Sequence, residues 1–170
     1  LRCGKELSRR FDSMTFDGFA KSILDRFRKG IPSNFRPSAD YEIDFTISNR
    51  NQMQDILQTA LGAAGFNQFQ IQQYNPRTFE SERLTKTLIH ETKDNAALLV
   101  WDYLLNKLSP SKATFTMIGR LAEYILRCNP LLLKALRQTY ANVFLDEFQD
   151  TTQIQYDLTC ACFKGTRSLL

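Results

Sequence analysis

Three carboxylates follow a short apolar run in residues 141–150, which read Ala-Asn-Val-Phe-Leu-Asp-Glu-Phe-Gln-Asp. An apolar run that ends abruptly in charge is typical of a strand buried on both faces, as in a parallel sheet. Ligands of such sheets bind beyond the carboxyl ends of the strands, where Asp146 and Glu147 would lie. Two neighbouring carboxylates there can hold Mg²⁺ through water and activate an attacking water in a nucleotide hydrolase. The pattern alone leaves open a second interpretation, a buried strand that ends in solvated acids, with Asp150 starting the next helix.

A nucleotide hydrolase also needs a loop that cradles the phosphates, and its usual sequence is GxxxxGK[ST]. That pattern does not occur in the sequence, because Gly4 and Lys5 are followed by Glu6. The two acids therefore constitute half of a hydrolytic site. We expect this chain alone to hydrolyse ATP poorly or not at all.

The composition is that of one globular domain, or of one domain with a small insertion, since 43% of the 170 residues are hydrophobic. A net charge of +4 permits a nucleic-acid partner without arguing for one. The four cysteines form no CxxC pair and His90 is the single histidine, so free thiols are favoured over a zinc site. The sequence has no apolar run of membrane-spanning length and no signal peptide, which favours a cytoplasmic protein without a membrane partner.

Apolar residues at helical spacing predict most of the secondary structure. Trp101 lies on one such apolar stripe and is expected in the core, and Thr152 and Gln155 have the spacing of a capping box. Short strands are expected at 11–16 and 141–145. The expected helices, with their capping and stop residues, cover residues 15–30, 48–65, 78–92, 94–110, 115–128, 131–140 and 152–165, and the segments 31–48 and 66–77 are expected to be irregular or extended.

Tyr74, Arg77 and Phe79 form an aromatic and basic segment that could contact a nucleic-acid strand, because aromatic rings and guanidinium groups stack on bases. Aromatic residues beside a proline-containing turn also commonly anchor that turn to the core. The sequence leaves both interpretations open.

Two motifs resemble a known family. Residues 143–152, Val-Phe-Leu-Asp-Glu-Phe-Gln-Asp-Thr-Thr, with Gln155 and Tyr156 following, closely resemble the Walker B motif of UvrD/Rep/PcrA-type superfamily 1 DNA helicases, whose usual string is DEYQD or DEFQD after an apolar strand. Residues 14–20, Met-Thr-Phe-Asp-Gly-Phe-Ala, resemble the family's TFHSF or TFHGF motif, with Asp17 where histidine is more usual. A histidine contact is therefore not carried over to this position. The order of the motifs also fits the family, which inserts a helical subdomain called 1B between them.

The fold that this resemblance implies is mostly α with a few short parallel strands. It is an incomplete RecA-like α/β core of the P-loop NTPase type that carries a helical insertion subdomain. Residues 1–30 and 111–170 would form part of the RecA-like subdomain 1A, and residues 31–110 the 1B-like insertion. The resemblance also implies a piece of a longer helicase, with the phosphate-binding loop before Leu1 and the γ-phosphate sensor and second RecA-like domain after Leu170.

The activity that the resemblance implies is ATP-driven translocation or unwinding of DNA, typically 3′ to 5′ on single-stranded DNA, as in DNA repair. ATP and Mg²⁺ would be the cofactors. Asp146 would coordinate Mg²⁺ through water and Glu147 would be the general base for hydrolysis. Gln149 and Asp150 would contact the nucleotide site and couple it to neighbouring motifs.

The partners that the resemblance implies are single-stranded or partly duplex DNA and the remaining helicase domains of the same protein, in the cytoplasm at the nucleoid. Thr15 and Phe16 would lie near the single-stranded DNA path. Arg77 and Phe79 are the further candidates for DNA contact.

Two alternatives remain open. An AddA- or RecB-like helicase-nuclease subunit shares the Walker B string, and the presence of a nuclease domain would identify it. A non-catalytic helical module that binds DNA or protein would use the acids only structurally. In that case Asp146→Asn in the full-length protein would leave ATP turnover unchanged.

Overall fold

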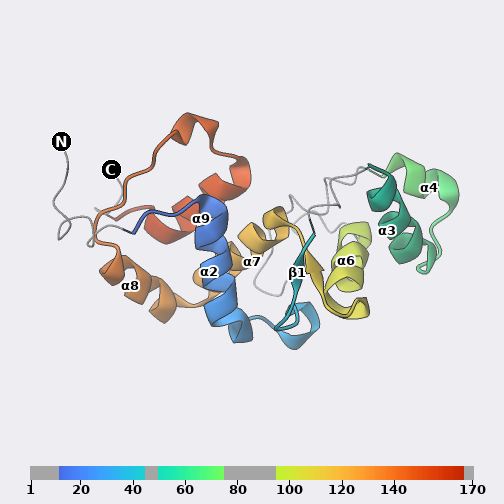
Figure 1. The fold of residues 1–170 in the computed structure, drawn as a ribbon, viewed down its shortest axis with the longest axis horizontal. Helices are drawn as coiled ribbons and strands as arrows, with labels where there is room; N and C mark the ends of the chain where they lie inside the picture. The colour runs from blue at the N-terminus through green and yellow to red at the C-terminus, as the bar shows by residue number, and fades with distance from the viewer. Residues whose placement is uncertain (1–11, 45–49, 75–94, 167–170) are drawn as a thin grey trace.

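The computed structural model describes residues 12–44, 50–74 and 95–166, and most of them are helical (Figure 1). Helix α6 (Asn95–Asp102) continues as a π-helical segment, η4 (Tyr103–Lys107), and two short strands, β1 (Glu42–Ile43) and β2 (Lys112–Ala113), pair in parallel. The prediction of a mostly helical fold with a few short parallel strands is confirmed at this level. The α-helices are α2 (Phe16–Phe27), α3 (Arg50–Gly62), α4 (Gln68–Gln73), α6 (Asn95–Asp102), α7 (Phe115–Cys128), α8 (Pro130–Thr139) and α9 (Gln153–Phe163), and the 3₁₀ turns are η1 (Arg28–Gly30), η2 (Ser33–Phe35) and η5 (Phe148–Asp150).

The elements pack in two groups. In the first, α7 contacts α2, α8 and α9, and α8 also contacts α9. In the second, α3 contacts α4 and α6, while η4 contacts β2 and η2. Figure 1 shows α8 and α9 at one end of the molecule, α3 and α4 at the other, and β1 between them. The assignment of these groups to a RecA-like subdomain 1A and a 1B-like insertion stays a prediction.

Helix α7 is the centre of the first group because it is buried around most of its circumference. Its first turn is capped by Thr114, whose Oγ1 accepts a hydrogen bond from the backbone N–H of Met117 at 3.2 Å. The helix ends at Cys128, where Asn129 precedes Pro130, since a residue before proline disfavours the helical conformation. The apolar side chains that it buries completely are Met117, Ile118, Leu121, Ala122, Ile125 and Leu126.

The parallel strand pair joins the segment after α2 to the segment before α7. The backbone N–H groups of Glu42 and Asp44 donate to the carbonyls of Ser111 and Ala113 at 2.8 and 3.1 Å. Lys112 Nζ lies 3.0 Å from Asp44 Oδ2, and the Asp44 side chain is only 8% exposed. The chain therefore leaves the α7 group after α2 and re-enters it before α7 through two segments that lie side by side.

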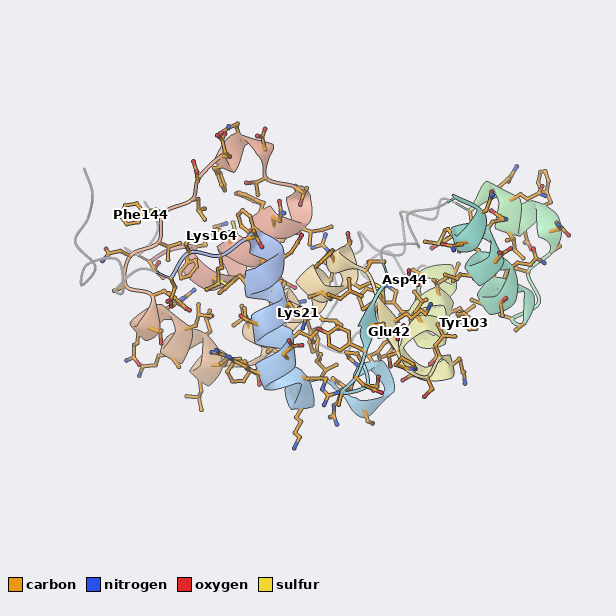
Figure 2. The ribbon with its side chains drawn as sticks, in the orientation of Figure 1. Lys21, Glu42, Asp44, Tyr103, Phe144 and Lys164 are labelled. Atoms are coloured by element: carbon orange, nitrogen blue, oxygen red, sulfur yellow. The ribbon has the colours of Figure 1, made fainter. Side chains whose placement is uncertain are left out.

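The two expected strands in the motif regions are wrong. Residues 12–15 form no strand, and Thr15 instead caps α2. In the expected strand at 141–145, only Val143 makes a bridge, and Phe144 is 67% exposed rather than buried. Figure 2 shows the Phe144 side chain pointing away from the helices. An interior strand of a parallel sheet is paired on both edges and covered on both faces, whereas the structure assigns this segment only the isolated bridge at Val143.

The segment expected to be irregular at 66–77 contains a helix instead, α4. Asn67 Oδ1 accepts from the N–H of Gln70 at 2.9 Å, and Gln70 Oε1 accepts from the N–H of Asn67 at 3.0 Å. This reciprocal capping box stabilises a helix whose apolar pattern is too short to predict it. The expected helix at 78–92 lies outside the described residues, as do Arg77, Phe79 and His90.

Candidate functional site

The acidic loop, residues 146–150, reverses the chain direction just before α9. Glu147 has a left-handed backbone, with φ 50° and ψ 39°, and among the described residues it is the one non-glycine residue with positive φ. Its N–H donates to Asp146 Oδ1 at 3.0 Å. A left-handed conformation is costly for a residue with a Cβ, so the surrounding contacts must hold Glu147 in it.

The contacts that hold the loop are mostly its own. The N–H of Asp150 donates to the carbonyl of Glu147 at 3.0 Å, and the N–H of Thr151 donates to that of Phe148 at 3.1 Å, which closes the turn η5. The Gln149 side-chain amide donates to Glu147 Oε2. The carboxylates of the loop are exposed to solvent and lie where a ligand could reach them.

Helix α9 begins directly after the loop with the predicted capping box. Thr152 Oγ1 accepts from the N–H of Gln155 at 3.4 Å, and Gln155 Oε1 accepts from the N–H of Thr152 at 2.9 Å. The rings of Phe148 and Tyr156 lie 6.3 Å apart between centroids, so the loop also packs on the first turns of α9. A hydrogen bond between Tyr156 and Cys160 raises the pKa of the Tyr156 hydroxyl.

A cavity of about 210 Å³ lies where the first turns of α2, α7 and α9 meet. Phe16 and Asp17 line it from α2, and Thr152 and Gln155 line it at the start of α9. The residue that departs from the family's histidine, Asp17, therefore faces the same space as the end of the 143–152 motif. The structure brings together two motifs that are far apart in the sequence.

The predicted DNA-contact residues are placed only in part. Thr15 Oγ1 accepts the capping hydrogen bond from the N–H of Gly18 at 3.1 Å, and Phe16 is half-buried at the cavity. The other two candidates, Arg77 and Phe79, lie outside the described residues. The structure thus places Phe16 beside the start of α9 and Thr15 at the first turn of α2.

The sequence model of the family described as UvrD/REP helicase N-terminal domain matches residues 2–170. The chain belongs to this family. No curated protein is significantly similar to it in sequence. Family membership implies a DNA helicase that binds ATP and DNA, and it agrees with the resemblance seen in the two motifs.

One contact in this helicase domain was missed at the sequence level. Arg120 of α7 is 3% exposed, and its Nη1 lies 2.6 Å from Asp157 Oδ2 of α9. The signal in the sequence is a basic residue among the apolar side chains of a buried helix, but the partner lies far along the chain. Spacing alone could not identify that partner.

Within the described part of the chain, no group of three or more histidine, cysteine or acidic residues is arranged to hold a metal ion. Cys128, Cys160 and Cys162 are free thiols, as expected, and Cys162 is buried. Among the same residues no helix has the length and apolar character needed to cross a bilayer.

Proposed function

We propose that this helicase domain supplies two acids of an ATP-hydrolysing site: Asp146 holds Mg²⁺ through water and Glu147 is the general base. The parent would move 3′ to 5′ along single-stranded DNA. The observation that carries the proposal is the pair of adjacent, exposed carboxylates in a turn held by its own hydrogen bonds.

Asp146 fits the role of a magnesium ligand. Its Oδ1 accepts the N–H of Glu147, while its Oδ2 has no protein partner among the described residues. Mg²⁺ favours hard oxygen ligands and keeps several waters, taking only one or two carboxylates together with substrate phosphates. A single carboxylate is therefore sufficient for this role. When bound, Mg²⁺ would neutralise charge that develops on the phosphates.

Glu147 fits the role of the base. Gln149 donates to Oε2, so Oε1 is left to accept a hydrogen bond from the attacking water. That contact orients the carboxylate while keeping one oxygen available for a proton. Gln149 would thus act on the nucleotide site through Glu147. The N–H of Asp150 closes the same turn on the carbonyl of Glu147, and the exposed Asp150 carboxylate would couple the turn to neighbouring motifs.

DNA contact is proposed at the start of α2, where Thr15 and Phe16 lie. The α7 group would be part of a RecA-like subdomain 1A, and the group around α3 a 1B-like insertion. The sequence contains no GxxxxGK[ST] loop, so we expect this chain alone to hydrolyse ATP poorly.

The test is Mg²⁺-dependent ATP hydrolysis by the full-length protein. We expect Glu147→Gln to lower kcat roughly 10²- to 10⁴-fold, the usual range for loss of a general base, with ATP binding retained. Asp146→Asn is expected to raise the Mg²⁺ concentration needed for half-maximal rate. Glu42→Gln, which changes an exposed carboxylate on β1, is the matched control and should leave both quantities unchanged. Turnover within about threefold of wild type in Glu147→Gln would show that the acids are structural, since a lost base costs far more.

A further inference from the structure

We propose that the partly buried ion pair between Arg120 and Asp157 is a positioning device, which holds the start of α9 and with it the acidic loop in place for ATP hydrolysis. This inference rests on the proposed roles of Asp146 and Glu147. In this inference Arg120 and Asp157, which lie outside the loop, affect the rate of the reaction at the loop.

The geometry of the pair ties α9 to α7 at one point. Arg120 Nη1 lies 2.6 Å from Asp157 Oδ2, and the two side chains are 4% and 18% exposed. The other carboxylate oxygen, Asp157 Oδ1, accepts from Gln153 Nε2 at 2.8 Å. One carboxylate therefore joins α7 to the first residue of α9.

Hydrogen bonds and a short stretch of backbone connect the Asp157 carboxylate to Asp146 and Glu147. Gln153 follows Thr152, whose backbone and side chain are held in the capping box. Toward the N-terminus, the N–H of Thr151 donates to the carbonyl of Phe148, and the N–H of Asp150 donates to the carbonyl of Glu147. These two hydrogen bonds close the turn. A displacement of the start of α9 is therefore transmitted to the turn that carries the acids.

Close contact between the two helices leaves little freedom at the same place. A Cβ added to Gly119, next to Arg120 on α7, would lie 2.9 Å from Ile154 Cγ2 in the first turn of α9. The first turn of α9 thus rests almost on the α7 backbone. The close contact at Gly119 and the Arg120–Asp157 ion pair together define the position of the first turn of α9.

Stability alone is a weak explanation for the pair, because apolar residues of similar volume often replace a buried ion pair without loss. Helix α7 also provides a matched comparison. Arg127 Nε lies 2.8 Å from Glu123 Oε1, and the Glu123 side chain is completely buried. Both partners of this second pair belong to α7, so it forms no bridge between α7 and the start of α9. Its loss should cost stability without moving the loop.

The first experiment measures backbone amide exchange in the full-length protein. We expect Arg120→Met to accelerate exchange in residues 146–152 about tenfold, since weaker anchoring raises the population of locally open states. Arg127→Met should leave this segment unchanged, although it also leaves a buried acid without its arginine. Asp157→Asn, which preserves side-chain size, is the milder variant if Arg120→Met fails to fold. Equal exchange of residues 146–152 in the Arg120 or Asp157 variant and in Arg127→Met would overturn the inference.

The second experiment measures kcat and KM for ATP in the same proteins. We expect Arg120→Met to lower kcat roughly 10- to 100-fold, because a misplacement of about 1 Å can cost that much, with KM changed far less. Arg120→Lys, which keeps the charge, should recover part of the loss. Faster loop exchange with normal kcat in Arg120→Met would refute a catalytic effect of the positioning. If instead Glu147→Gln retained full turnover, the proposed base would be wrong, while the exchange data would still decide whether the pair holds the loop.

Discussion

The contact between Gly119 and Ile154 gives a sharp test of how closely α9 packs on α7. In Gly119→Ala the new methyl group would lie 2.9 Å from Ile154 Cγ2, closer than ordinary van der Waals contact. Ile154 is β-branched and half-buried, so its Cγ2 cannot easily rotate away. Atoms in the first turn of α9 must therefore move to make room for the new methyl group.

Two opposing free-energy changes decide the magnitude. Alanine is favoured over glycine in a helix interior by about 1 kcal/mol. Overpacking a tight contact costs roughly 1–3 kcal/mol. We therefore expect Gly119→Ala to lower the free energy of unfolding by about 1 kcal/mol, within a range of roughly 0–2 kcal/mol. Gly62→Ala is the matched control, because its nearest atom is the Gln58 side-chain nitrogen at 3.8 Å, and it should be neutral or stabilising.

The assay is urea unfolding followed by circular dichroism, in a double-mutant cycle with Ile154→Ala. In the Ile154→Ala background the methyl group has room, so Gly119→Ala should now raise the free energy of unfolding by up to about 1 kcal/mol. The expected coupling between the two sites is about 1–3 kcal/mol, within the range seen for residues in contact. A coupling below about 0.3 kcal/mol, with Gly119→Ala stabilising in both backgrounds, would refute the close approach of the helices.

Two further predictions concern stability in the same assay. Glu147→Gly should raise the free energy of unfolding by roughly 0.5–1 kcal/mol, because glycine accepts the left-handed conformation that Glu147 adopts at φ 50°. Asp146→Gly, at a position without positive φ, should be destabilising, and the opposite order of the two variants would contradict the left-handed turn. Burial raises the pKa of the Cys162 thiol from 9.0 to about 12, so the unfolded chain loses this proton first and stability should fall between these pH values. In Cys162→Ala this part of the alkaline loss should disappear, and an unchanged pH profile would show that the thiol is not buried.

The helices that could be predicted from sequence are those whose apolar stripe and capping residues agree. The structure confirms the helix expected at 115–128, and the capping box of Thr152 and Gln155 forms as its spacing predicts. Trp101 is fully buried, as its place on an apolar stripe predicts. These features depend on residues within a few turns of one another, so sequence contains what is needed to predict them.

The features that could not be predicted depend on contacts distant in sequence or on short local exceptions. Helix α4 has few apolar residues and is started by the side chains of Asn67 and Gln70. The strand expected at 141–145 requires neighbouring strands, and the structure assigns this segment only an isolated bridge, at Val143. Arg120 could be recognised as unusual on a buried helix, but its partner Asp157 could not be identified by spacing.

The acidic loop combines both kinds of feature. The sequence motif identified Asp146 and Glu147 as candidates, because the types and order of the residues are sufficient to recognise two adjacent carboxylates. Their relative orientation is set by the left-handed backbone of Glu147. That conformation is costly, so it persists only while the turn and the start of α9 remain fixed. In our proposal the start of α9 is held by Arg120, which is far away in sequence. A match to the motif therefore predicts which acids are present but not the orientation of their side chains. Two proteins with the same string could therefore differ in rate through the residue that stands at the position of Arg120.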